Sequence, residues 1–153
     1  MFGSRMQVSL PNDILISEVG RLLNEGKDVV LMTKGSSMLP HIIGGRDSVL
    51  LRKNKEVNEG DVVLAEVGKS HYVLHRIVRI EGEEVTLRGD GNIVGCERCR
   101  PGDILGTVVE ISAPSGKSRK PGRAVVWRHL GAFPRRCILA VYRRTVLKII
   151  KVK

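Results

Sequence analysis

The hydrophobic pattern changes once near the beginning of the chain. Residues 11–27, PNDILISEVGRLLNEGK, place apolar side chains at the three- and four-residue spacing of an amphipathic helix. Asn12 or Asp13 can cap this helix, and Gly26 can end it. After it, apolar residues gather in short runs rich in valine and isoleucine, which are typical of strands. The pattern therefore predicts an N-terminal helical segment, residues 1–27, followed by a mostly β region.

Several short runs in residues 28–111 carry the strand pattern. They are DVVLM, DSVLLRK, DVVLAEV, HYVLHRIVRI, EVTLRGD and DILGTVVEI. Turns that combine glycine with an acidic residue separate some of them, as in NEGD, IEGEE and RPGD. Short strands joined by such turns favour antiparallel pairing. The sequence thus predicts a mostly β domain of about six strands over residues 28–111.

The chain ends in a segment of different composition. Residues 112–122, SAPSGKSRKPG, have the composition of a linker. Residues 123–153 return to helical spacing, with a break expected near Gly131 and Pro134. On a helical wheel one arc is apolar (Ile138, Val141, Tyr142, Val146, Ile149, Ile150) and the opposite arc is basic (Arg136, Arg143, Arg144, Lys148, Lys151). We therefore expect a basic amphipathic helical tail over residues 123–153.

Nearly all the excess charge lies in that tail. The net charge is +10; residues 1–110 carry 14 Lys+Arg and 16 Asp+Glu, whereas residues 111–153 carry 12 Lys+Arg and no acid. A near-neutral body with a basic tail argues against a specific nucleic-acid-binding domain. With Trp127 just upstream, the tail could contact an anionic membrane surface. Its apolar arc could equally pack on the β domain or on a second copy of the chain.

The sequence also limits location and cofactors. It holds no apolar run of about 18 residues, and its first residues lack the pattern of a secretory signal, so we expect a cytoplasmic protein, peripheral to the inner membrane surface if the tail binds there. The three cysteines favour reduced thiols. Cys96 and Cys99 form a single CxxC pair without two further ligands nearby, so we interpret them as structural thiols and expect neither a metal nor a cofactor.

One turn carries candidate chemistry. The segment GSSMLP, residues 35–40, sets two serines between a glycine and a proline, which can hold a hydroxyl group on a rigid rim. A serine nucleophile needs a neighbouring base whose pKa is near the working pH, and histidine meets that requirement with little adjustment. Of the four histidines, His75 lies inside the longest strand-like run, where a sheet could hold its ring.

Five motifs occur in the order of a known superfamily. GSSMLP, GDVVLAEV, HRIVRI, LRGDGN and DILGTVVEI together resemble the signal peptidase I and LexA-type serine protease superfamily. The chain is most similar to the endoplasmic-reticulum and archaeal signal peptidases, in which a His-Arg pair replaces Lys-Arg. The resemblance covers roughly residues 30–111, and it implies a signal-peptidase-like β domain.

The resemblance also assigns roles to individual residues. Ser37, directly before Met38, matches the nucleophile, and His75, directly before Arg76, matches the general base. Asp90 matches the Gly-Asp box, where it could orient His75 or brace the turn. A second acid expected after this box is missing, and Glu97 is the only acid there, so the orienting residue stays open between the two. The residues that would border the substrate are Gly35, Ser36, Met38 and Pro40.

The implied activity is that of a serine endopeptidase. By resemblance, it would cleave a peptide or protein precursor that binds as an extended strand, with small side chains next to the scissile bond. A glycine at position 35 replaces a hydroxyl residue that often supports the oxyanion, and the first residues show no membrane anchor. These departures leave an alternative: a catalytically inactive member of the superfamily that binds a peptide or a membrane surface.

Overall fold

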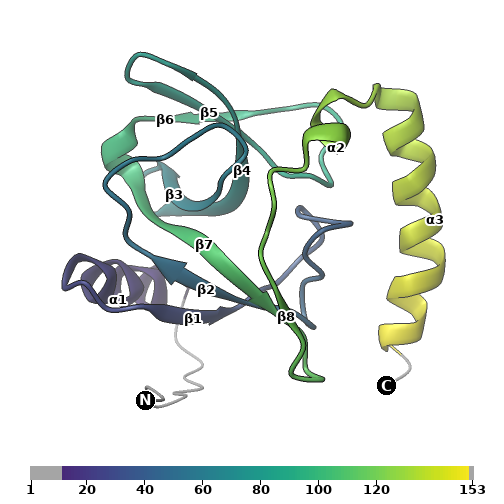
Figure 1. Cartoon of the computed structure of the whole chain (residues 1–153), viewed down its shortest axis with the longest axis horizontal. Helices are drawn as coiled ribbons and strands as arrows, with labels where there is room; N and C mark the ends of the chain where they lie inside the picture. Colours follow the sequence, from purple (N-terminus) through teal and green to yellow (C-terminus); the bar gives the residue numbers. More distant parts are fainter. Residues whose placement is uncertain (1–11, 152–153) are drawn as a thin grey trace.

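The computed structural model describes residues 12–151, and the side chains of residues 14–145, as an antiparallel β structure with helices at both ends (Figure 1). The eight described strands follow the order β1-β2-β7-β3-β4-β5-β6, with β8 also paired to β7. The bounds are α1 Asn12–Asn24, β1 Val29–Met32, β2 Ser48–Arg52, β3 Val62–Gly68, β4 His71–Glu81, β5 Glu84–Arg88, β6 Glu97–Cys99, η1 Pro101–Asp103 (a 3₁₀ turn), β7 Ile104–Ser112, β8 Ser118–Arg119, α2 Val125–His129 and α3 Ala132–Lys151. The mostly β fold expected from the sequence is confirmed.

The helix α1 covers one face of the sheet. Ile16, Val19 and Leu23 recur at helical spacing and are all buried against strands β2, β3 and β7. The helix can approach closely because β7 has glycine at position 106. A Cβ atom built there would lie 2.9 Å from a methyl group of Leu23 and 3.3 Å from the carbonyl oxygen of Arg52. The amphipathic pattern and one strand glycine together seat α1 on the sheet.

The central strand β3 is buried on both faces. Val62 and Leu64 belong to the core beneath α1, whereas Val63 and Ala65 belong to a second core with β4, β5 and β7. Successive residues of a strand point to opposite faces, so the run VVLA serves both cores without a polar residue. The pairings of β2 with β7, β3 with β7 and β4 with β5 each contain a bulge, which increases local twist. The sheet is therefore strongly curled, as Figure 1 shows.

The C-terminal segment packs on the body. Ser118 and Arg119 pair with Ser112 and Ile111 of β7, so the expected linker contains a short added strand. The helical break falls at residues 130–131, as predicted, whereas Pro134 lies inside the first turn of α3. Figure 1 shows α3 along one side of the molecule, joined to the sheet through α2.

A third core lies between this segment and the loop that joins β1 to β2. Trp127 and Leu139 are buried there against Leu39 and Ile43, with Tyr142 partly buried beside them. Part of the predicted apolar arc thus packs on the β domain. Its members Ile138 and Val141 are instead exposed, and the side chains of Val146, Ile149 and Ile150 lie outside those described.

No helix among the described residues is both long enough and apolar enough to cross a membrane.

Candidate active site

The loop that holds the two serines is closed at its base. Thr33 and Asp47 face each other there: the Thr33 N–H and hydroxyl both donate to the Asp47 carbonyl, at 3.1 and 2.7 Å. The buried Asp47 carboxylate accepts the Ile43 N–H at 2.9 Å. Gly35 has φ = +77°, and a Cβ at Gly44 would lie 2.0 Å from its carbonyl oxygen. Both glycines are therefore needed for the chain to cross itself at this point.

Ser37 lies at the rim of a cavity of about 340 Å³. The two residues after it are anchored in different cores: Met38 packs beneath α1, and Leu39 packs against Trp127. This double anchoring fixes the backbone at Ser37, whose side chain stays half-buried. Gly35 and Met38 also line the cavity. The other two residues expected to border a substrate, the exposed Ser36 and the half-buried Pro40, are not part of its described lining.

His75 lies on β4 with its ring buried. In the register it faces Val63 of β3, and its Nδ1 lies 2.8 Å from Oε2 of Glu97, the first residue of β6. Because the strands run β4-β5-β6, Glu97 reaches His75 from two strands away. One ring nitrogen is thus held by a carboxylate, which leaves Nε2 to face the Ser37 loop.

Gly89 is the point where His75 and Ser37 approach each other. A Cβ atom at Gly89 would lie 2.3 Å from the Ser37 carbonyl oxygen and 3.1 Å from His75 Nε2. Two residues later, the Gly91 N–H donates to the same Ser37 carbonyl at 2.8 Å. The described hydrogen bonds include none between the Ser37 hydroxyl and the His75 ring. The structure therefore brings both residues to one glycine turn without joining their side chains.

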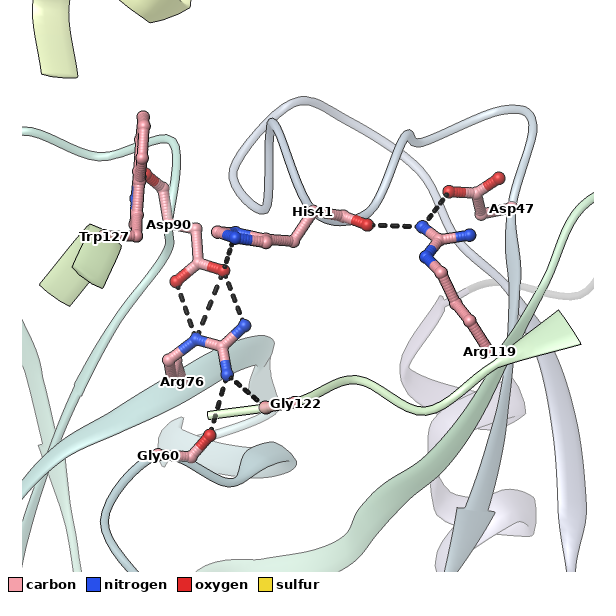
Figure 2. A network of polar contacts seen from close by, with 8 residues as sticks. All are labelled: His41, Asp47, Gly60, Arg76, Asp90, Arg119, Gly122 and Trp127. Atoms are coloured by element: carbon pink, nitrogen blue, oxygen red, sulfur yellow. Dashed lines mark hydrogen bonds and ion pairs between the residues drawn. The ribbon is translucent and has the colours of Figure 1, made fainter. Parts of the chain in front are cut away.

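Asp90 contacts a different partner (Figure 2). Its carboxylate accepts hydrogen bonds from Arg76 Nε at 2.9 Å and Nη2 at 2.8 Å, and it lies 2.8 Å from Nδ1 of His41. The fully buried Arg76 guanidinium also donates to the carbonyls of Gly60, at 2.7 Å, and Gly122, at 2.9 Å. The sequence left two roles open for Asp90, orienting His75 or bracing the turn, and these contacts support the second.

The charge on Asp90 follows from these contacts. Burial raises the pKa of this carboxyl, but the contacts with His41 and Arg76 outweigh it and hold the pKa below its usual range. Asp90 is therefore ionised at neutral pH, and it compensates the buried charge of Arg76. Of the two acids considered for orienting His75, Glu97 is the one that touches the ring.

The C-terminal segment contacts the same turn. Trp127 Nε1–H donates to the Asp90 carbonyl at 2.9 Å, and its ring meets that of His41 edge-to-face at 5.8 Å between centroids. Arg119 donates to the His41 carbonyl at 2.5 Å. Sequence reasoning missed Gly89, His41, Gly122 and Trp127 as parts of this site. Only the Gly-Asp motif itself could have directed attention to Gly89.

The lining of the cavity beside Ser37 combines polar residues, such as Lys34, Ser70 and His71, with a set of apolar side chains. Helix α1 contributes Leu15 and Ile16, β1 contributes Leu31, and β4 contributes Tyr72 and Leu74. Strand β1 is an edge strand, so its outer backbone groups have no strand partner within the described sheet. An extended peptide could pair with that edge and place an apolar side chain in the cavity.

The three cysteines form no disulfide bond with one another. Cys99 is buried in β6, whereas Cys96 and Cys137 are exposed, and all three are free thiols. Burial raises the pKa of the Cys99 thiol to about 11. Within residues 12–151 no three His, Cys, Asp or Glu side chains are placed to hold a metal ion.

Comparison with known proteins gives one family. The family model described as Peptidase S24-like matches residues 4–109. No curated protein matches the chain significantly. The matched region holds Ser37, His75, Asp90 and Glu97, whereas Gly122 and Trp127 lie beyond its end.

Replacement of Gly89 by alanine should separate Ser37 from His75. The added methyl group would overlap the Ser37 carbonyl, and relief of such overlap typically costs about 1–3 kcal/mol. We expect Gly89→Ala to lower the free energy of unfolding in urea and to speed amide hydrogen exchange in residues 35–40. Gly102→Ala is the control, because a Cβ there meets nothing within 4 Å. Equal behaviour of the two variants would contradict the close approach at Gly89.

Replacement of Asp90 by asparagine should leave the buried Arg76 charge uncompensated. We expect a loss of about 3–5 kcal/mol in the free energy of unfolding at pH 7. Because the folded pKa of Asp90 is lowered, its contribution is present at neutral pH, declines below the unfolded value of about 3.9, and is lost as pH falls through the folded value. Urea unfolding at a series of pH values measures both effects, and the difference between wild type and variant should shrink below about pH 4. The control Asp28→Asn removes a surface pair with Arg52 and should cost about 0–1 kcal/mol.

Proposed function

Because the chain belongs to the Peptidase S24-like family, we propose that it is a serine endopeptidase with Ser37 as the nucleophile and His75 as the general base. One observation carries the proposal most directly. Glu97 holds Nδ1 of His75 at 2.8 Å, while Nε2 of the same ring faces the glycine turn that touches the Ser37 backbone. A base held by a carboxylate beside a serine is the arrangement that nucleophilic catalysis requires.

The proposed reaction proceeds in two halves. His75 Nε2 accepts the hydroxyl proton as Ser37 Oγ bonds to the carbonyl carbon of the peptide. The resulting imidazolium is stabilised by Glu97, and it returns the proton to the leaving amine as the peptide C–N bond breaks. Water then attacks the acyl-enzyme with His75 again as the base, which releases the acid and restores Ser37. Hydrogen bonds in a site without substrate are often loose, so the lack of a described hydrogen bond between Ser37 and His75 does not by itself argue against the pair.

Backbone groups at the serine could stabilise the oxyanion. Among the described hydrogen bonds, neither the Ser37 N–H nor the Met38 N–H acts as a donor. Free N–H groups at the nucleophile can bind the negative oxygen of the tetrahedral intermediate, and loss of one such donor in other hydrolases costs about 100- to 1000-fold. This supports a backbone oxyanion hole in which the missing hydroxyl at Gly35 is dispensable.

The substrate we propose is an extended peptide segment. Its backbone would pair along β1, and an apolar side chain near the scissile bond would enter the cavity lined by Leu31, Leu74 and α1. The resemblance of the Ser-Met-x-Pro and His-Arg motifs to signal peptidases supports a precursor, rather than a mature protein, as the source of that peptide.

A peptide-binding module without activity is the second candidate. It is favoured by the absence of a described hydrogen bond between the Ser37 hydroxyl and the His75 ring. The same cavity and the same strand edge would then hold a peptide that is not cleaved. The two candidates differ in whether the serine oxygen reacts.

A fluorophosphonate probe tests that difference. We expect the wild-type protein to be labelled between pH 6 and 9, and Ser37→Ala to lose the label, because the probe bonds only to an activated serine oxygen. Ser36→Ala is the matched control, since this exposed neighbour is not part of the cavity and its loss should leave labelling unchanged. Intact-protein mass spectrometry gives the extent of labelling. If the wild-type protein stays unlabelled across this pH range, the endopeptidase proposal is wrong and the peptide-binding module without activity is favoured.

Replacement of Glu97 by glutamine tests the orienting residue. A glutamine amide can donate to Nδ1 of His75, which places the ring proton on Nε2 and removes the base. We expect the labelling rate to fall by about 100- to 10,000-fold, with little change in the free energy of unfolding. Arg98→Gln, at the exposed next position, should react at the wild-type rate. If Glu97→Gln also reacts at that rate, Glu97 does not orient the base.

A further inference from the structure

Large apolar side chains are exposed mainly on the two C-terminal helices. Of the nine such residues within the described side chains, five lie between positions 125 and 141. They are Val125, Val126, Phe133, Ile138 and Val141, with Val126 and Phe133 at 78% and 77% exposure. Clustered exposed apolar residues indicate a binding surface more often than scattered ones do.

The inner side of α3 is already used. Arg135 and Leu139 are buried, and Tyr142 packs partly against the third core. Phe133 and Val141 are two turns apart on the side of α3 that faces away from these residues. Ile138 lies between Val141 and the buried side, and it is 42% exposed. We call the five exposed apolar residues, together with Arg136, Arg143 and Arg144, the outer surface of α2 and α3.

Charge on this surface has one sign. Arg136, Arg143 and Arg144 are exposed, and the whole stretch 111–153 contains no acidic residue. The described ion pairs of the C-terminal segment join Arg119 to Asp47 and Arg128 to Glu59, and none involves the three exposed arginines of α3. Arg143 does donate through Nη2 to the Gly91 carbonyl at 3.4 Å, but a neutral carbonyl does not compensate its charge. Their positive charge is therefore available to a partner.

We propose that the outer surface of α2 and α3 binds an anionic lipid bilayer. A bilayer satisfies both properties at once, because its acyl boundary takes the apolar side chains and its phosphate groups take the arginines. A nucleic acid would pair with the charges but leave most of the apolar side chains in water. A second copy would bring two strongly basic segments together, which repel each other. Trp127 takes no part, because it is buried with its N–H on Asp90.

The proposal does not depend on peptide cleavage. The third core connects the inner side of these helices to Leu39 and Ile43, whereas the cavity at Ser37 is lined by other residues of the same loop, such as Met38 and Ile42. Lipid binding on the outer surface would therefore leave the cavity open to a peptide.

Vesicle sedimentation of the full chain tests the proposal. We expect binding to vesicles that contain phosphatidylglycerol, and at least about 100-fold weaker binding to pure phosphatidylcholine, with the difference lost at about 1 M salt. The triple variant Arg136→Gln, Arg143→Gln, Arg144→Gln should bind anionic vesicles about 10- to 100-fold more weakly. Phe133→Ser should weaken binding about 10-fold through loss of buried apolar area.

A matched variant separates local from overall charge. The triple replacement of Lys53, Lys55 and Lys69 by glutamine removes the same charge from exposed positions on the β domain, and it should leave vesicle binding unchanged. Equal weakening by both triple variants would overturn the proposal, as would equal binding to neutral vesicles. Failure to bind vesicles, with either salt-sensitive retention of a nucleic acid or a dimer in sedimentation velocity, would assign the surface to that other partner. The substituted side chains are exposed, and each triple variant removes one described hydrogen bond, from Arg143 to Gly91 or from Lys53 to Asn24, so circular dichroism should show unchanged folding for both.

Discussion

The buried ion pair between Arg76 and Asp90 connects the parts of the molecule that the candidate site needs. A guanidinium without accessible surface is strongly unfavourable unless its charge and its N–H groups are all satisfied. Here Asp90 supplies the charge, and the carbonyls of Gly60 and Gly122 accept further hydrogen bonds. Because Asp90 is fixed, the glycines on both sides of it are fixed as well, and these glycines hold the carbonyl of Ser37.

The same pair gives the C-terminal segment a structural function. The ion pair is shielded from water only if the open side of the Asp90 turn is covered. Trp127 covers that side, and its indole N–H donates to the Asp90 carbonyl. Leu139 then packs behind Trp127 against Leu39, two residues after Ser37. The segment is therefore part of the support for the serine loop, although the family match ends at residue 109. What remains free for another partner is only its outer surface.

Local patterns in the sequence were sufficient for the elements, but not for the contacts between them. Helical spacing identified α1, and the β-branched runs identified six of the strands. The strands β6 and β8 were missed because three and two residues are too few to show a period of two. The contact of Glu97 with His75 depends on the register of three strands, which no local pattern encodes. The burial of Trp127 was missed for the same reason, since its partners are distant in sequence.

The alternation of side chains along β4 explains why His75 and Arg76 contact two different acids, Glu97 and Asp90. His75 and Arg76 are consecutive in a strand, so they point to opposite faces of the sheet. Their register partners confirm this, because Val63 beside His75 lies in the second core and Val62 beside Arg76 lies in the first. One carboxylate cannot reach both faces. The arginine is compensated by Asp90 from the turn after β5, and the histidine is held by Glu97 from β6. In this fold the His-Arg pair of β4 therefore depends on β6, short as it is, because β6 carries the acid that contacts the imidazole.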